Sequence, residues 1–369
     1  MTTHRIAILA GDGIGPEIMR EALKVLRLVE ERTGVRFKLT DTPFGAQAYF
    51  DHGHPFPDAT KAVCDAADAI LKGPVGLSYE ATKQIPVDLQ PERGAVLPLR
   101  ARYNTYANFR PVVLPRALAH FSPLRPEIIG SGIDIMLIRE LVGGLYFGAK
   151  TVGVDAQGHR YVEEALRYDE IQIKQVLKRA LELAQRRKGV LHNIHKSNVL
   201  KSSVLWNEVL EEMAPAYPDV KIVHMLVDAA ATHLCLNPRQ FDVMVMENMF
   251  GDILSDQGGG IIGSLGLMPS ACIGDAKAYY EPSHGSAPDI AGRGIANPYS
   301  MIGSAAMMLE HSFGMAAEAR AIWAAMQSVF ADGYSTADLT QPGSTARIIS
   351  TTEFGDKVVA KLREAPITS

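Results

Sequence analysis

Residues 5–17 read RIAILAGDGIGPE, a short apolar run followed at once by a turn with three glycines and then a proline. The apolar run is typical of a buried strand, and Pro16 suits the first turn of a helix because its φ is already helical. A strand, a glycine-rich turn and a helix in this order often place a dinucleotide's pyrophosphate at the helix N-terminus. Pro16 stands where the third glycine of G-x-G-x-x-G belongs. The stretch therefore predicts an α/β fold and leaves the phosphate-binding role of the turn open.

The rest of the chain alternates between strand and helix patterns. Further strands are predicted at 67–72, 134–138 and 241–246, and helices at 16–32, 171–187, 200–216, 298–311 and 316–330. This alternation predicts a parallel or mixed sheet covered by helices. We find no repeat and no low-complexity linker, so two domains, if present, share a continuous scaffold.

Composition points to an ordinary globular enzyme. Of 369 residues, 47% are apolar and 21% charged, and the net charge of −4 predicts no nucleic-acid or anionic-membrane partner. No apolar run approaches the roughly 18 residues that span a bilayer, and the start does not resemble a signal peptide. The three cysteines lie far apart and are expected to be reduced thiols. The chain is therefore predicted to be cytoplasmic.

The densest polar group is ENMFGDILSD, residues 247–256. Asp252 and Asp256 are four residues apart, so a helix presents both carboxylates on one face. Two like charges at that spacing repel unless a cation neutralises them, and oxygen ligands suit Mg²⁺ or Mn²⁺. The alternative is a solvated acidic face, but the apolar flanks favour a half-buried metal pair. Gly259 and Gly260 are expected to break the helix.

Other polar residues lie in apolar surroundings. Three arginines, Arg100, Arg110 and Arg139, have the planar fork that suits carboxylates. A single such arginine is usually half of a structural ion pair, whereas three beside a carboxylate pair indicate a dicarboxylate substrate. Asp228 would be costly to bury unpaired. Lys196 is a candidate base and Tyr146 a second candidate, although either alone is more often a packing side chain.

Two further stretches each have a purely structural and a functional interpretation. Residues 280–298 form a loop rich in glycine and proline that either merely connects elements or lets a backbone approach a ligand. Residues 151–161 predict a polar hairpin with Gln157 and Gly158 at its tip, either a solvated loop or a clasp between subunits.

Eight motifs in a fixed order tie these groups together. They are GDGIGPE (11–17), PERGAVLPLR (91–100), YANFRP (106–111), RELVGGLYFG (139–148), HKSNVL (195–200), VDAAA (227–231), ENMFGDILSD (247–256) and EPSHGSAPDIAGRGIANP (281–298). Over essentially its whole length the chain resembles the β-decarboxylating dehydrogenases of 2-hydroxy acids, the isocitrate and isopropylmalate dehydrogenases. The resemblance implies two domains on one long twisted mixed sheet, distinct from a Rossmann fold. Residues 1–105 with 264–369 would form the first domain, and 106–263 the second. It also implies a homodimer clasped by an arm at 151–164.

The resemblance also implies a role for each motif. Asp252 and Asp256 of one subunit and Asp228 of the other would hold Mg²⁺ or Mn²⁺, while Tyr146 and Lys196 of the partner subunit would form the acid–base pair. Substrate would contact Val96, Leu97, Arg100, Arg110, Arg139, Val199 and Asp228. The cofactor residues would be Ile14, Asn198, His284, Gly285, Ser286, Ala287, Asp289, Ile290 and Asn297. Asp289 favours NAD, because an acidic group binds a ribose diol and repels a 2′-phosphate.

The substituent on the malate is predicted from residues 95–97, Ala-Val-Leu. An apolar pocket favours an isopropyl group and disfavours a third carboxylate, whose burial would be unpaired. We therefore expect NAD-dependent oxidation and decarboxylation of 3-isopropylmalate to 4-methyl-2-oxopentanoate, a step of leucine biosynthesis. The alternatives are a relative acting on tartrate, D-malate, another alkyl- or arylmalate or homoisocitrate, and, from another class, a non-catalytic ligand-binding protein.

Overall fold

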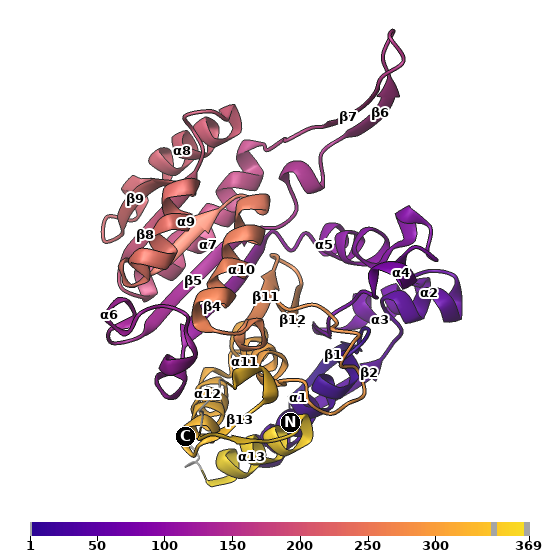
Figure 1. The fold of residues 1–369 in the computed structure, drawn as a ribbon, viewed down its shortest axis with the longest axis vertical. Coiled ribbons are helices and arrows are strands. Elements are labelled where there is room, and N and C mark those ends of the chain that lie inside the picture. The colour runs from indigo at the N-terminus through magenta and orange to yellow at the C-terminus, as the bar shows by residue number, and fades with distance from the viewer. Residues whose placement is uncertain (1, 341–344, 365–369) are drawn as a thin grey trace.

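One ten-stranded mixed sheet runs through the whole molecule in the computed structural model, which describes residues 2–340 and 345–364 (Figure 1). The strand order is β2-β1-β3-β12-β11-β4-β5-β10-β8-β9. These strands are β1 (Thr3–Leu9), β2 (Arg36–Asp41), β3 (Ala69–Lys72), β4 (Ala107–Leu114), β5 (Ile133–Glu140), β8 (Val190–His195), β9 (Lys221–Leu226), β10 (Val243–Met246), β11 (Pro269–Ile273) and β12 (Ala278–Pro282).

Helices cover both faces of the sheet. They are α1 (Gly15–Thr33), α2 (Ala46–His52), α3 (Asp58–Ala66), α4 (Tyr79–Thr82), α5 (Leu97–Tyr103), α6 (Pro126–Ile129), α7 (Glu170–Arg186), α8 (Lys201–Met213), α9 (Val227–Leu236), α10 (Asn248–Ile262), α11 (Tyr299–Phe313), α12 (Ala316–Ala331) and α13 (Thr351–Glu364). The five predicted long helices match α1, α7, α8, α11 and α12 to within a few residues, whereas α13 was not predicted. None of the helices in the described ranges is both long enough and apolar enough to cross a membrane.

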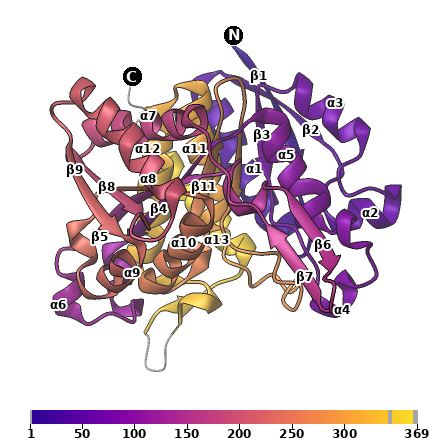
Figure 2. The same cartoon turned by 90° about the horizontal axis from the view of Figure 1, so that it is seen from above.

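The sheet changes direction in its middle. β1, β2, β3 and β12 pair in parallel at one end, and β5, β10, β8 and β9 pair in parallel at the other. Between them, β11 is antiparallel to both β12 and β4, and β4 is antiparallel to β5. Figure 2 shows β1 and β2 at one side of the molecule and β8 and β9 at the other. The predicted mixed sheet and shared scaffold are confirmed. The proposed domain boundaries stay a prediction.

The turn after β1 is packed against two other loops. A Cβ on Gly11 would lie 2.1 Å from the carbonyl oxygen of Pro74, and one on Gly13 would lie 2.0 Å from that of Ser286. Both glycines also have positive φ, which side chains disfavour. The Ile14 N–H donates to the same Ser286 oxygen at 2.8 Å. The glycines therefore allow backbone to approach backbone.

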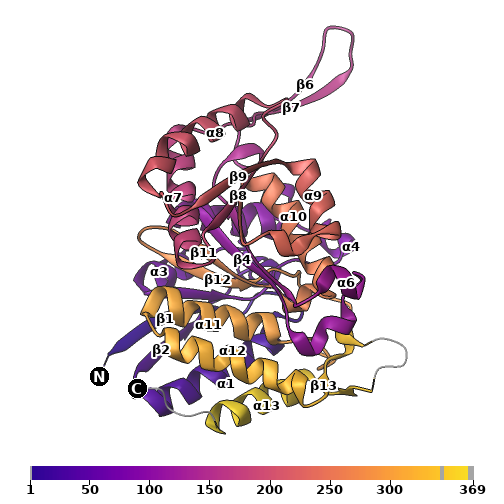
Figure 3. The same ribbon diagram turned by 90° about the vertical axis from the view of Figure 1, so that its left-hand side faces the viewer.

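Two strands form a hairpin of their own, β6 (Lys150–Val154) and β7 (Arg160–Glu164). It projects from the body of the protein (Figures 1 and 3). Its apolar side chains are exposed, with Val152 at 78% and Val162 at 66%. Gly158 occupies the left-handed region in the turn. The predicted hairpin at 151–161 is confirmed, while its role as a clasp is taken up below.

The predicted helix break at Gly259 and Gly260 is wrong. α10 continues to Ile262 and ends at Gly263, whose φ is +98°. Close packing needs Gly258 and Gly259 instead, because a Cβ on Gly258 would lie 2.6 Å from the Val112 side chain of β4 and one on Gly259 would lie 2.4 Å from the Leu265 side chain, whereas one on Gly260 would have no atom within 4 Å. The sequence prediction also missed β2, β4, β8, β9, β11 and β12.

Candidate active site

Arg139, Asp252 and Tyr146 form the centre of the polar cluster. Arg139 is on β5 and almost fully buried, and its guanidinium pairs with the Asp252 carboxylate of α10. The Tyr146 hydroxyl donates to the other Asp252 oxygen at 2.8 Å. Gly251 makes this possible, because a Cβ there would lie 2.5 Å from the Arg139 side chain. The helix can therefore lie directly on the arginine.

A second ion pair, between Arg110 and Asp256, lies one turn of α10 beyond Asp252. Arg110 is buried on β4, and its guanidinium is 3.6 Å from the Asp256 carboxylate. It also donates to the Ser255 hydroxyl at 2.6 Å and to the Asn108 amide oxygen at 2.7 Å. Both α10 carboxylates thus face arginines, although the Asp252 side chain is 40% exposed and that of Asp256 59%.

Arg100 approaches from α5 and is held by the strand β12. Its Nε donates to the Tyr279 hydroxyl at 3.1 Å, and its Nη2 is 3.9 Å from the Glu281 carboxylate. The same carboxylate pairs with the buried Lys72. Arg100 and Arg139 interact electrostatically, as do Arg110 and Arg139. The three predicted arginines therefore surround one region.

These charges shift the pKa values of the cluster. Burial lowers the pKa of Arg139 to about 10, and the neighbouring Arg110 and Arg100 add to that effect. Burial alone would raise the pKa of Asp252, but Arg139 and the Tyr146 hydrogen bond hold it below its usual value. Burial and the hydrogen bond to Asp252 raise the pKa of Tyr146 to about 12. Tyr146 is therefore protonated at neutral pH.

Lys196 and Asp228 form a second, separate pair. Lys196 follows β8, and its Nζ donates to Asp228 Oδ1 at 2.9 Å. Asp228 is in the first turn of α9 with a side chain that is 66% exposed, and the bond to Lys196 lowers its pKa. In a single chain Asp228 is therefore neither buried nor unpaired. His195 is buried, and its Nδ1 accepts the Ser197 N–H at 3.2 Å.

Behind the cluster lies a polar network that the sequence reasoning missed. The Asn248 side-chain oxygen accepts from Nε and Nη2 of Arg139 at 3.0 and 2.8 Å, and its amide donates to the Gly143 carbonyl at 2.9 Å. The Glu140 carboxylate accepts the N–H groups of Val142 and Gly143 at 2.8 and 3.0 Å. Burial raises the pKa of Glu140 to about 7. Polar residues inside otherwise buried motifs were the available signal.

The loop after β12 meets the turn that opens the sequence. Ser286 donates its hydroxyl to the Gly76 carbonyl at 2.8 Å, while its own carbonyl accepts from Ile14. The buried carboxylate of Asp12 accepts the N–H groups of Ala46, Gln47 and Gly76 at 2.8, 3.0 and 2.8 Å. Three loops distant in sequence are thereby joined.

The other predicted cofactor residues lie in this loop or near it. His284 has a buried Nε2 with no partner among the described residues, and burial lowers its pKa. No atom lies within 4 Å of a Cβ built on Gly285, and Ala287 adopts a φ of +40°. Asp289 is exposed and Ile290 half-buried, whereas Asn198 lies elsewhere, exposed after Lys196. Asn297 is buried, with its amide bonded to Asp338 and to the Tyr299 N–H.

The residues predicted to contact the malate substituent differ in their burial. Val96 is 8% exposed and packs in the small core cluster with Leu9, Phe44 and Leu99. Leu97 is half-buried, and Val199 is 69% exposed on the single chain. The residues 95–97 are apolar and contain no side chain that would pair with a third carboxylate.

The donor sets fit the two groups that the resemblance implies. Asp252 and Asp256 supply hard oxygen donors on one helix face, although the described residues of one chain contain no group of three or more acidic, histidine or cysteine side chains placed to hold a metal ion. The open space at Gly285 and the unpartnered His284 nitrogen fit a ligand that approaches the backbone closely. A single chain therefore offers two of the three expected metal carboxylates.

The fold is that of a decarboxylating dehydrogenase. Residues 5–358 match the model of the isocitrate/isopropylmalate dehydrogenase family, and the chain belongs to that family. Among its relatives, the 3-isopropylmalate dehydrogenase of Thermotoga maritima is 46% identical over 98% of this chain and 99% of its own. That of Geobacter sulfurreducens is 45% identical over 97% and 99%. A crystal structure of isocitrate dehydrogenase from Methylococcus capsulatus has a TM-score of 0.84 and 34% identity, covering 98% of this chain and 99% of the other.

Proposed function

We propose that this protein oxidises and decarboxylates a 3-substituted malate, and that the substrate is 3-isopropylmalate in leucine biosynthesis. The observation that carries the reaction class is the pairing of two buried arginines, Arg139 and Arg110, with the two carboxylates of α10, while the buried Arg100 is close enough to help lower the pKa of Asp252. Several relatives of 44–46% identity are named 3-isopropylmalate dehydrogenase, which supports the isopropyl substituent. The apolar run at residues 95–97 supports it independently.

The arginines are proposed to bind the two carboxylates of the malate. Arg100, Arg110 and Arg139 are held from behind by Tyr279, Asn108 and Asn248, so their guanidinium groups are oriented before substrate arrives. Bidentate pairs with a planar fork give both orientation and affinity. Substrate carboxylate would take the place that the Asp252 carboxylate now has on Arg139.

Proton transfer is assigned to Lys196 with Asp228 and to Tyr146. Lys196, with Asp228 beside it, would take the proton from the C2 hydroxyl as the hydride leaves C2. The resulting 2-oxo acid loses its β-carboxylate as CO₂, and Tyr146 would deliver a proton to the carbon left behind. The raised pKa of Tyr146 keeps that proton available at neutral pH.

Two bound groups complete this chemistry. When bound, NAD accepts the hydride, and Mg²⁺ or Mn²⁺ stabilises negative charge on the substrate oxygens. Asp252 and Asp256, with Asp228 of the partner subunit, would hold the cation. The loop at 284–297 and Ile14 would hold the adenosine end of NAD. Asp289, exposed in that loop, would favour NAD over NADP.

These residue roles require a homodimer with shared active sites. The Lys196–Asp228 pair is separate from the α10 carboxylates in one chain, so a second chain would have to bring it there. Leu236 of α9 and Ile253 of α10 are both 61% exposed, and the hairpin β6–β7 exposes its valines. Apolar surface of this kind is typical of an interface. We propose that the hairpin clasps the partner and that the enzyme is cytoplasmic.

The decisive experiment is a steady-state assay with NAD⁺ and Mg²⁺ across a substrate panel. It would contain 3-isopropylmalate, isocitrate, homoisocitrate, D-malate and tartrate. We expect the highest kcat/KM for 3-isopropylmalate. Equal or faster turnover of another member would refute the substrate. A non-catalytic protein would turn over none of them.

The mechanism has its own test. Lys196→Ala and Asp252→Ala are each expected to reduce NADH formation at least about 100-fold without changing the dimer. Asp51→Asn, which removes an exposed carboxylate on α2, is the matched control and should keep full activity. Unchanged rates in the first two variants would refute the assigned roles.

A further inference from the structure

A hollow lies against the face of the sheet that is turned away from the residues of the candidate active site. It has a volume of about 750 Å³ and lies between α7 on one side and α11 and α12 on the other, over β4 and β11. Figure 3 shows these helices above and below the strands. An adjoining hollow of about 560 Å³ shares Val113, Asp134 and Gln327 with it. We call the two together the rear groove. None of the residues assigned above to substrate, cofactor or metal lines it.

The floor and one wall of the rear groove are apolar and aromatic. Phe109 and Met136 come from the sheet, Leu183 from α7, and Met307 and Trp323 from the two helices opposite. The rings of Phe109 and His311 meet edge to face, with centroids 5.6 Å apart. Aromatic and aliphatic linings of this kind bind the apolar body of a small ligand.

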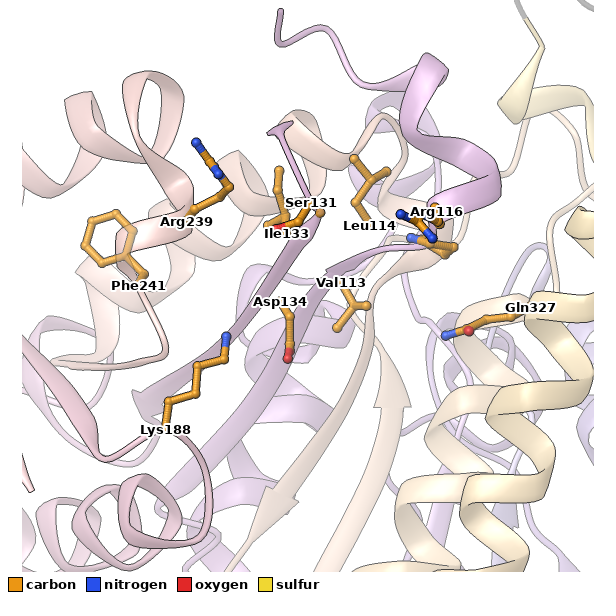
Figure 4. A pocket seen from close by; sticks show the side chains of 12 residues that line it. Val113, Leu114, Arg116, Ser131, Ile133, Asp134, Lys188, Arg239, Phe241 and Gln327 are labelled. Carbon is orange, nitrogen blue, oxygen red and sulfur yellow. The ribbon is translucent and has the colours of Figure 1, made fainter. Parts of the chain in front are cut away.

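The rim of the rear groove is positively charged although the protein is acidic overall. Arg179 and Arg187 line it and are paired, with Asp275 and with Asp134 and Asp242. Arg186, at the end of α7, has no carboxylate partner among residues 2–340 and 345–364, and the same holds for Lys188 and Arg116. In Figure 4, Lys188 and Gln327 extend from opposite sides of the groove, with Asp134 between them.

Carboxylates do not balance these cations. Within the described part of the chain, the acidic side chains that line the groove are those of Asp134 and Glu310, and Asp134 is already paired with Arg187. Even counting Asp242 and Asp275, which pair from outside, the basic side chains outnumber the acidic ones. A cationic rim over an apolar floor selects a ligand that carries negative charge on an apolar body.

We propose that the rear groove is a second ligand site, which binds a small organic anion with an apolar body, its charge at Arg186 and Lys188 and its body against Trp323 and Phe109. Such a ligand would contact α7 and the α11–α12 pair at once. NAD and the malate would not compete directly with it, because none of the residues proposed to bind them lines the rear groove.

The probe for this site is 8-anilinonaphthalene-1-sulfonate, an aromatic sulfonate whose fluorescence rises in apolar surroundings. The enzyme is titrated with it in the presence of saturating NAD⁺ and Mg²⁺, so that the cofactor site is filled. We expect saturable binding with a stoichiometry of one per chain and energy transfer from tryptophan. The chain has two tryptophans, of which Trp323 lines the groove and Trp206 is buried beside Asn193. Trp323→Phe should remove most of the transfer, and Trp206→Phe should leave it.

Charge variants decide the outcome. Arg186→Glu should weaken binding of the probe at least about tenfold, because it replaces an attraction by a repulsion. Arg186→Gln should weaken it less and leaves the end of α7 less perturbed. Arg320→Glu makes the same charge change on an exposed position of α12 outside the groove and should change the affinity less than about twofold. Equal affinity in the Arg186 variants, or displacement of the probe by NADH, would overturn the proposal.

Discussion

Asp12 is the residue of the opening stretch whose replacement tests the structure most directly. Its side chain is 4% exposed, with Oδ2 accepting from Ala46 and Gly76 and Oδ1 accepting from Gln47. Asp12→Asn keeps one oxygen, which can serve the first two donors, and turns an NH₂ group toward the Gln47 N–H. The partly buried Gln47 N–H then loses its acceptor, and the other two bonds lose their ionic character.

The magnitude follows from these bonds. A hydrogen bond to a charged group contributes about 1.5–3 kcal/mol, and an unsatisfied buried donor costs about 1–3 kcal/mol. We therefore expect Asp12→Asn to lower the free energy of unfolding by about 2–4 kcal/mol, a large share of the ~5–15 kcal/mol typical of folded proteins. Because Gly76 also contacts Ser286, the variant should raise the KM for NAD⁺ several-fold more than the KM for the malate.

Urea unfolding of the dimer at fixed protein concentration measures the first quantity, and steady-state kinetics the second. Asp51→Asn is the control, because its carboxylate is exposed and bonds only to Gln47 within α2. A loss below about 0.5 kcal/mol together with unchanged KM for NAD⁺ would show that the three loops do not depend on Asp12.

Three further predictions concern the site and the core. Tyr146→Phe should lower kcat by about 10²–10⁴-fold with little change in KM, because it removes a proton donor but none of the arginines proposed to bind the substrate carboxylates. An unchanged kcat in steady-state assays would exclude that role. Asn248→Ala should raise the KM for the malate at least about tenfold while the affinity for NADH, measured by fluorescence, stays the same, because the guanidinium of Arg139 loses its orienting oxygen. Burial lowers the pKa of His192 to about 4, below its unfolded value of about 6.5, so the unfolded chain binds the extra proton. Stability should therefore be fully present above pH 6.5 and fall toward pH 4, by up to about 3 kcal/mol, and His192→Gln should flatten this dependence in urea unfolding at several pH values.

Sequence alone determined the features that depend on local pattern. The alternation of strands and helices, the long amphipathic helices and the start of α1 at Gly15-Pro16 follow from periodicity and backbone preference within a few residues. The spacing of Asp252 and Asp256 placed both carboxylates on one helix face, and the order of eight motifs was enough to identify the family.

Tertiary structure alone decided how these pieces meet. No local pattern distinguishes glycines that break a helix from glycines that let α10 lie on Val112 and Arg139, because the neighbour is more than a hundred residues away. The antiparallel seam at β11 and β4, the support of Arg139 by Asn248 and the binding of three loops by Asp12 are likewise contacts between distant segments. The same holds for the turn GDGIGPE. Its glycines look like a phosphate loop in the sequence, but in the fold two of them make room for the carbonyls of Pro74 and Ser286. Which atom fills the space of a missing side chain depends on how distant loops pack against the turn, and the local sequence does not contain that information.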